Sequence, residues 1–402
     1  ITMQLISEER KTRASLSKNI NVQDKVGRSA GVLKNARLLS CDEYMKLISN
    51  VRFGIAEKLL SGITLEDIHT LTVAVQPATM AAAHGSNLSA GQRDILRADE
   101  VRKALKGATP HRPVVPAHPG RMVFPDFDVA DAEPYIDWNF FFPAWGLKGR
   151  YPEILDHPEK GEEARKVFAD AQTLLARIRE ERLLTLQAAV GIFPARSEGD
   201  DIWITDPKGR EHRLAMLRNQ TRGQDNLSLA DFIAPEGDWI GCFAVTAGIG
   251  LKELCEKFRA GGDDYNAIMA KLLADRLTEA FAEAVHSFVR RQMWGYETGE
   301  APTPRQVIRG EYRGRRMAFG YPASPDHSLK REVFDLLAAE LTTGMKLTEN
   351  YMVDPGEALC GLLLADADYF SVGTVDTKQL LDYARRRGLD VELVKKLIPH
   401  NI

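Results

Sequence analysis

Prolines recur at every third position in the stretch TPHRPVVPAHPG, namely Pro110, Pro113, Pro116 and Pro119. Proline lacks a backbone N–H and restricts φ, so this spacing excludes both an α-helix and a central strand. A period of three residues is typical of polyproline II, which acts as a semi-rigid spacer. The stretch therefore predicts a proline-rich linker over residues 108–130, between a segment at 1–107 and a domain at 131–402.

The segment before the linker has the pattern of helices. Apolar residues recur at helical spacing from Tyr44 to Leu60. The sequences TLED at Thr64 and SAGQ at Ser89 each place an acid or glutamine three residues after a hydroxyl side chain, which is the pattern of a capping box. We therefore expect a small all-α segment over residues 1–107.

The larger part mixes helical and extended patterns. Helices are expected over residues 160–183, 263–296 and 328–344, and at the C-terminus, and the second has a long apolar stripe that includes Leu277 and Phe281. The segments AAVGIFPA, DDIWITD, DWIGCFAVTA and ALCGLLLA are typical of strands, and GMKLTENYMV is expected to be extended. Because strands and helices do not alternate regularly, we predict an α+β fold, a twisted, largely antiparallel sheet flanked by long helices.

Composition narrows the function classes. A net charge of −3 argues against a broad nucleic-acid surface, and the sequence has no apolar run long enough to span a membrane. Four cysteines without a CxxC pair are typical of a reducing, cytoplasmic protein without a disulfide framework or zinc site. The segment GIGLKE at Gly248 has only part of a dinucleotide-binding motif, so we interpret it as a turn at the end of a strand.

One connection, RGRRMAFGYPASPDH at residues 314–328, is unusually rich in arginines and rigid turns. Gly320 allows close approach of the backbone to a ligand, and Pro322 and Pro325 stiffen the turn. Arg315 and Arg316 place guanidinium groups where they can bind a carboxylate. The stretch therefore predicts a ligand-clamping loop, and the alternative is a surface loop with solvated arginines.

Seven segments together carry a family resemblance. In chain order they are YIDWNFFFPAWGLKGRYPEIL, GIFPA…GDDIWI, LADFIAP, DDYNAIMAKLLADRLTEAFAE, RRMAFGYPASPDH, TGMKLTENYMVDPGEALCGL and DYFSVGTVDTKQLLDYARRRG. Over roughly residues 115–400 they resemble the C-terminal activation domain of cobalamin-dependent methionine synthase.

This resemblance implies that the domain binds S-adenosylmethionine as methyl donor, to reactivate methionine synthase after its cobalamin has been oxidised to Co(II). The implied partners are a cobalamin-binding module and a flavodoxin or flavoprotein reductase. The resemblance assigns no catalytic and no metal-binding residue to this chain. It assigns ligand binding to six residues: Asp137, Glu279, Arg316, Tyr321, Tyr369 and Phe370.

The residue types fit this ligand. Its sulfonium and ammonium groups suit Asp137 and Glu279, and its carboxylate suits Arg316. Aromatic faces hold a cation or an adenine. Each residue also has a structural alternative, because Asp137 can cap a turn, Glu279 can be solvated on a helix, and the Tyr369–Phe370 pair can belong to the core.

The sequence departs from the family pattern in three places. Asn139 and Phe140 replace the usual Thr-Pro, Ser324 replaces a cysteine, and the segment from Gly361 to Tyr369 is two residues short. The D-x-H-x-x-G motif of a cobalamin module is missing, since the nearest match, DIHTLT, ends in Thr72. We therefore expect methyltransferase chemistry only together with a separate module that carries cobalamin, and no turnover by this chain alone.

Residues 1–107 contain the segment LSAGQRDILRADEVRKALKG, which includes the motif RDILRA. On this motif they resemble a different family, the C-terminal segment of bacterial protein-arginine kinases. The resemblance implies that Arg93, Asp94 and Arg97 bind phosphoarginine. The structural alternative is an ordinary amphipathic helix whose charged side chains are solvated and bind no ligand. Two alternatives to the leading function follow, a phosphoarginine-binding regulatory or docking module and a fusion without joint function.

Overall fold

The computed structural model describes residues 113–221 and 224–402. In this part of the chain the main sheet has seven strands: β1 (Gly120–Phe127), β2 (Thr185–Glu198), β3 (Asp201–Thr205), β4 (Glu211–Ala215), β5 (Asp238–Ile249), β6 (Arg315–Ala318) and β9 (Ala358–Leu364). A separate hairpin pairs β7 (Lys346–Leu347) with β8 (Val353–Asp354).

The α-helices of the described part are α7 (Val129–Ala132), α8 (Gly161–Glu180), α9 (Leu251–Ala260), α10 (Asp264–Phe288), α11 (Pro304–Ile308), α12 (Lys330–Leu337), α13 (Ala339–Thr342), α14 (Thr377–Arg387) and α15 (Val391–Leu397). A π-helical turn, η6 (Val289–Trp294), continues α10. Short 3₁₀ turns are η1 (Glu133–Tyr135), η2 (Trp138–Phe140), η3 (Phe142–Trp145), η4 (Glu153–Asp156), η5 (Leu229–Phe232) and η7 (His327–Leu329). None of the described helices is long and apolar enough to cross a membrane.

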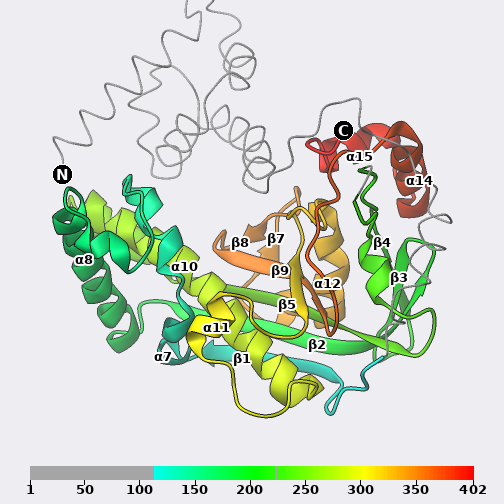
Figure 1. Cartoon of the computed structure of the whole chain (residues 1–402), viewed down its shortest axis with the longest axis horizontal. Coiled ribbons are helices and arrows are strands. Elements are labelled where there is room, and N and C mark those ends of the chain that lie inside the picture. The colour runs from blue at the N-terminus through cyan, green and yellow to red at the C-terminus, as the bar shows by residue number, and fades with distance from the viewer. Residues whose placement is uncertain (1–112, 222–223) are drawn as a thin grey trace, which may run out of the picture. The chain divides into compact units, whose positions relative to one another are not determined.

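The sheet has the strand order β4-β3-β2-β5-β9-β6, and β1 pairs with the N-terminal half of β2 (Figure 1). Every neighbouring pair is antiparallel. This confirms the predicted α+β class with its antiparallel sheet. The turn expected at GIGLKE is also present, because Gly250 has a φ of +91° between β5 and α9.

Alternation along β5 separates the two faces of the sheet. Cys242 and Ala244 belong to a buried cluster that contains Phe334 and other α12 side chains. The intervening Phe243 points to the opposite face. Its ring centroid lies 5.9 Å from the guanidinium of Arg316, which is paired with Glu283 of α10 (2.8 Å). The central strands therefore separate α10 from α12 (Figure 1).

Residues 120–127 lie within the range expected to be a linker, yet they form β1. The apolar pattern of this strand is broken by Pro125, which sits at a register irregularity between Phe124 and Phe127. Both phenylalanines pack on α10, against Phe288 (5.3 Å) and Phe281 (4.8 Å). A bulge thus lets a proline-containing segment join the sheet.

The helix expected over residues 328–344 is interrupted. Ala338 adopts a left-handed conformation with a φ of +52° and separates α12 from α13. This kink lets Leu336, Leu337 and Ala339 all be buried. The apolar pattern does not reveal the break, because glycine or asparagine is the usual residue in this conformation.

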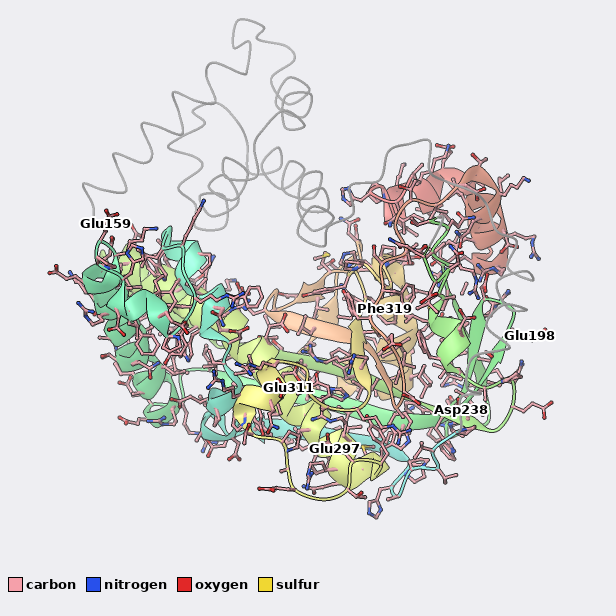
Figure 2. The ribbon with its side chains drawn as sticks, in the orientation of Figure 1. Glu159, Glu198, Asp238, Glu297, Glu311 and Phe319 are labelled. Carbon is pink, nitrogen blue, oxygen red and sulfur yellow. The ribbon has the colours of Figure 1, made fainter. Side chains whose placement is uncertain are left out.

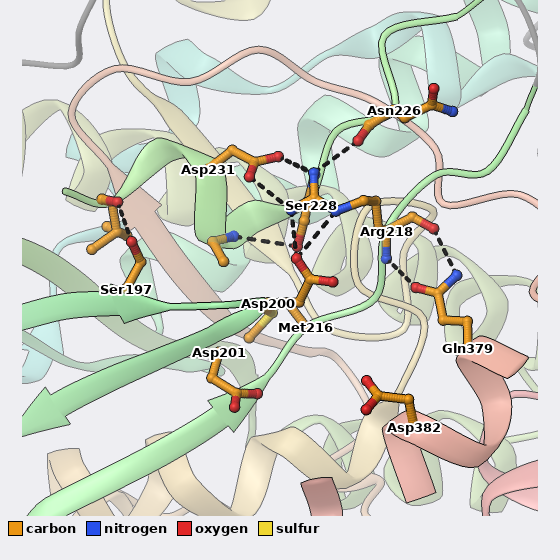
Figure 3. A network of polar contacts seen from close by, with 12 residues as sticks. Ser197, Asp200, Asp201, Met216, Arg218, Asn226, Ser228, Asp231, Gln379 and Asp382 are labelled. Atoms are coloured by element: carbon orange, nitrogen blue, oxygen red, sulfur yellow. Dashed lines mark hydrogen bonds and ion pairs between the residues drawn. The ribbon is translucent and has the colours of Figure 1, made fainter. Parts of the chain in front are cut away.

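A buried polar network around Arg218 anchors α14 to the sheet (Figure 3). The Arg218 guanidinium is hydrogen-bonded to Asp231 (2.5 and 2.7 Å) and to Asp200 (2.5 and 3.1 Å). Gln379 of α14 accepts from the Arg218 amide (2.7 Å) and donates to its carbonyl (3.0 Å). The first turn of α14 is therefore fixed to the chain that follows β4.

Candidate functional site

Arg316 lies on β6, at one edge of the main sheet. The next residue, Met317, belongs to the buried cluster on the α12 side. Strand alternation therefore directs Arg316 to the α10 side, where its guanidinium lies 5.9 Å from the ring centroid of Phe243. The segment expected to be a loop thus begins as a strand, which gives Arg316 a rigid backbone.

Two carboxylates of α10 bind Arg316. Its Nη2 lies 2.8 Å from Glu283 Oε1, and its Nη1 lies 3.5 Å from Glu279 Oε2. Positions 279 and 283 are four apart, so both side chains are on one face of the helix. Burial alone would lower the pKa of Arg316, but Glu283 and Glu279 outweigh it and raise the pKa. The guanidinium is therefore a permanent cation.

The two carboxylates differ in how firmly they are held. Glu283 is only 16% exposed and also accepts from the Tyr312 hydroxyl (3.0 Å). Glu279 is 37% exposed, and both of its contacts are long, 3.5 Å to Arg316 and 3.4 Å to the Tyr321 hydroxyl. Glu283 therefore fixes Arg316, while Glu279 remains available to solvent or a ligand.

Tyr321 is presented by a tight turn directly after β6. The Gly320 amide donates to the Ser324 carbonyl (2.8 Å), and the Ser324 amide donates to the Tyr321 carbonyl (2.9 Å). Gly320 has a φ of +88°, a conformation that favours glycine. Figure 2 marks Phe319, the buried residue that joins β6 to this turn.

The segment with Tyr369 and Phe370 is tied to the same turn, because the Val372 amide donates to the Pro322 carbonyl (2.9 Å). Tyr369 is 44% exposed. Desolvation and then the Glu279 carboxylate raise the pKa of Tyr321. Tyr369 also raises it, so the Tyr369 hydroxyl lies within electrostatic range of Tyr321. Phe370 instead packs against two buried clusters and lies 6.3 Å from Phe232.

Asp137 lies in a separate turn. Its Oδ1 accepts from the backbone amide (3.0 Å) and side-chain amide (2.8 Å) of Asn139, as the N-cap of η2. No hydrogen bond or ion pair joins it to the other five expected ligand residues in the described ranges. Phe140 of the same turn lies under the guanidinium of Arg276 of α10 (5.6 Å), which brings this turn beside α10.

The structure thus brings Glu279, Arg316, Tyr321 and the Tyr369 segment together, and adds three residues that the sequence analysis missed. Glu283 binds Arg316 and is itself bonded by the Tyr312 hydroxyl. Arg276 lies within electrostatic range of Tyr321, whose raised pKa it opposes slightly. Positions 276, 279 and 283 share one helix face, so helical spacing from Glu279 was the signal available in the sequence.

The structure does not describe the residues expected to bind phosphoarginine. Arg93, Asp94 and Arg97 are outside the described residues, as is the all-α segment to which they belong. Within residues 113–221 and 224–402, no group of three or more histidine, cysteine or acidic side chains is arranged to hold a metal ion.

Comparison with known proteins bears on both parts of the chain. The family described as "Protein-arginine kinase McsB C-terminal domain" matches residues 19–114. The family described as "Vitamin B12 dependent methionine synthase, activation domain" matches residues 128–388. A solved structure, the "Crystal Structure of the MetH Reactivation Domain bound to AdoHcy", is 41% identical, with a TM-score of 0.69 over 72% of this chain and 92% of that chain. The chain therefore belongs to the family of vitamin B12-dependent methionine synthase activation domains.

Proposed function

We propose that the domain binds S-adenosylmethionine as the methyl donor for reductive reactivation of a cobalamin-dependent methionine synthase. The observation that carries this proposal is the cluster of Arg316, Glu279 and Tyr321 at the edge of the sheet. The solved relative supports it, since that domain was crystallised with AdoHcy, which shares the amino-acid and adenosine groups of the proposed ligand.

The cluster offers complementary groups to each end of the ligand. Arg316 takes the carboxylate through Nη1, whose contact to Glu279 is long and exchangeable, while Glu283 retains Nη2. Glu279 then pairs with the ammonium or the sulfonium. Asp137 supplies a second carboxylate from the η2 turn once its hydrogen bonds to Asn139 rearrange.

Aromatic side chains complete the proposed site. Tyr321 and Tyr369 are 36% and 44% exposed, so their rings are accessible to an adenine. Phe370 acts from the core, where it fixes the segment that carries Tyr369. This division leaves Phe370 as a supporting residue of the ligand site.

The domain acts with partners in this proposal. The cobalamin is carried by a separate module, and a flavodoxin or flavoprotein reductase supplies the electron. The domain binds S-adenosylmethionine, whose methyl group is transferred to the cobalamin. We expect no methionine synthesis by this chain alone, and we place its activity in the cytoplasm.

Replacing Arg316 with alanine should weaken S-adenosylmethionine binding by about 1.5–3 kcal/mol, the range for hydrogen bonds to charged groups. This corresponds to about a ten- to hundredfold rise in Kd, measured by calorimetric titration. Arg309→Ala is the matched control, because Arg309 is 56% exposed and pairs only loosely with Glu311 (3.7 Å). Absence of binding by the wild type would overturn the proposed function, and equal Kd values would remove Arg316 from the site.

Replacing Gly320 with alanine should weaken binding of the same ligand by about five- to hundredfold, because backbone strain of this kind costs about 1–3 kcal/mol. A Cβ at Gly320 would lie 2.1 Å from Cε1 of His327 in a left-handed conformation, so the turn that presents Tyr321 must shift. Gly310→Ala is a suitable comparison, since it also has a positive φ but nothing within 4 Å of its Cβ. If both variants lost the same affinity, the effect would come from backbone strain in general and not from displacement of the turn that carries Tyr321.

A further inference from the structure

The turn that presents Tyr321 rests on a histidine ring. An ideal Cβ at Gly320 would meet Cε1, Nε2 and Nδ1 of His327 at 2.1, 2.4 and 2.8 Å. The imidazole therefore lies flat against the Gly320 backbone, which precedes Tyr321 directly. Any displacement of this ring changes the support of the turn.

The ring is held in place by a buried lysine. Lys330 is only 5% exposed, and its Nζ lies 2.7 Å from His327 Nδ1 and 3.2 Å from the Tyr351 carbonyl. Such a contact needs one proton between the two nitrogens. When the Lys330 ammonium donates, Nδ1 of a neutral His327 ring accepts. If the ring were protonated, Nδ1 would also carry a proton, and two donors would face each other.

The charges around His327 come from three elements. Lys330 of α12 opposes protonation of the ring, as does His400 near the C-terminus, while the neighbouring Asp326 favours it. Asp326 is itself engaged, since it accepts from the Tyr383 hydroxyl of α14 (2.7 Å) and from Ser328. Burial and Lys330 together lower the pKa of His327 to about 4.

We propose that Lys330 is a positioning residue, which keeps the His327 ring neutral beneath Gly320 and thereby makes ligand binding by the Tyr321 turn insensitive to pH between about 5.5 and 7.5. This inference rests on the proposed function. Without the Lys330 charge, the pKa of His327 rises, although burial still holds it below its usual value. The charged ring then leaves the backbone for solvent, and the turn loses its support.

The test compares wild type with Lys330→Met in the full chain, at constant ionic strength. We expect the wild-type Kd for S-adenosylmethionine to change less than about twofold between pH 7.5 and 5.5, and that of Lys330→Met to rise at least about threefold, because the pKa of His327 moves up toward this range. The double variant Lys330→Met/His327→Asn, which has no ring to titrate, should regain a flat profile. A purely structural role of Lys330 would lower stability without adding a titration to Kd.

A second measurement does not depend on the ligand. NMR of ¹³C-labelled histidine follows each ring, and the His327 signal is the one missing from His327→Asn. We expect its midpoint below about 5 in the wild type and about one pH unit or more higher in Lys330→Met. A wild-type midpoint near 6.5 would overturn the proposal even if Lys330→Met failed to fold. Absence of ligand binding by the wild type with the expected NMR midpoints would instead count against the proposed function.

The control is Lys378→Met, which removes an exposed lysine of α14. Its Kd profile should match that of the wild type at both pH values. An acid-induced loss of affinity in this control as large as that of Lys330→Met would show that overall charge is responsible, and would overturn the role assigned to Lys330.

Discussion

The free energy of unfolding should fall by about 3 kcal/mol or more when the pH is lowered from 7 to 4.5. The pKa of His327 is lowered from 6.5 to about 4. The pKa of His286 is also lowered, by complete burial and then by Arg290, Arg316 and Arg315. Below pH 6.5 these two histidines are protonated in the unfolded chain but stay neutral in the folded chain. The free energy of unfolding is therefore highest above pH 6.5 and falls as the pH is lowered toward the folded pKa values. Each histidine contributes a loss of about 1.4 kcal/mol per pH unit.

Urea unfolding at several pH values measures this loss. The sequence has five tryptophans, Trp138, Trp145, Trp203, Trp239 and Trp294, so tryptophan fluorescence follows unfolding of the part of the chain that contains His286 and His327. His327→Asn should reduce the pH dependence by roughly half, since one of the two titrating rings is removed. His118→Asn, which changes an exposed histidine, should leave it unchanged. Equal stability at pH 7 and 4.5 in the wild type would contradict this prediction.

Regular periodicity explains which parts of the fold were predictable. The helix expected over residues 160–183 is α8, and the one expected over 263–296 is α10 with its π-helical continuation. These long segments bury a continuous apolar stripe, which is a strong signal. The missed features depend on contacts distant in sequence, as with β1, which contains Pro125 and is completed by the phenylalanines of α10.

The sequence predicted part of the ligand site but not the residues that support it. The family resemblance points to Arg316, Glu279 and Tyr321, which the structure brings together, although their role in binding stays a prediction. Residue type does not reveal that Glu283 binds Arg316 and is itself bonded by Tyr312, because these contacts depend on how β6 packs against α10. The support of Gly320 by His327 is similarly hidden, since it depends on a turn that folds back over seven residues.

Asp137 illustrates the limit of transferring residues one by one. The family resemblance assigns it to the ligand, yet Asn139, where the sequence departs from the family, donates to it twice. The Asn139 side chain also accepts from the Tyr151 amide (2.9 Å), which fixes the asparagine in this position. A local hydrogen bond thus competes with the expected role, and its donor is a residue at which the sequence departs from the family pattern.

Replacing Arg218 with methionine should lower the free energy of unfolding by about 3–5 kcal/mol, the range for breaking a buried ion pair by removing one partner. Arg218 is 3% exposed, and Asp200 and Asp231, whose side chains are each 12% exposed, would lose its guanidinium (Figure 3). Burial alone would lower the pKa of Arg218, but its bonds to Asp231 and Asp200 raise it, so the cation is stabilised by both partners. Urea unfolding at pH 7, followed by tryptophan fluorescence, measures the loss.

The control for this variant is an arginine with similar partners but more solvent. Arg196 is 37% exposed and pairs with Glu198 (3.0 Å) and Glu211 (3.2 Å), which are more exposed still. Arg196→Met should therefore cost less than about 1 kcal/mol. Adding Asp231→Asn to Arg218→Met should recover part of the loss, because it removes one uncompensated charge. The prediction would be contradicted if Arg218→Met lowered the free energy of unfolding no more than Arg196→Met. In that case the Arg218 side chain would not be needed to hold α14 to the sheet, and the Gln379 bonds to the Arg218 backbone would be sufficient.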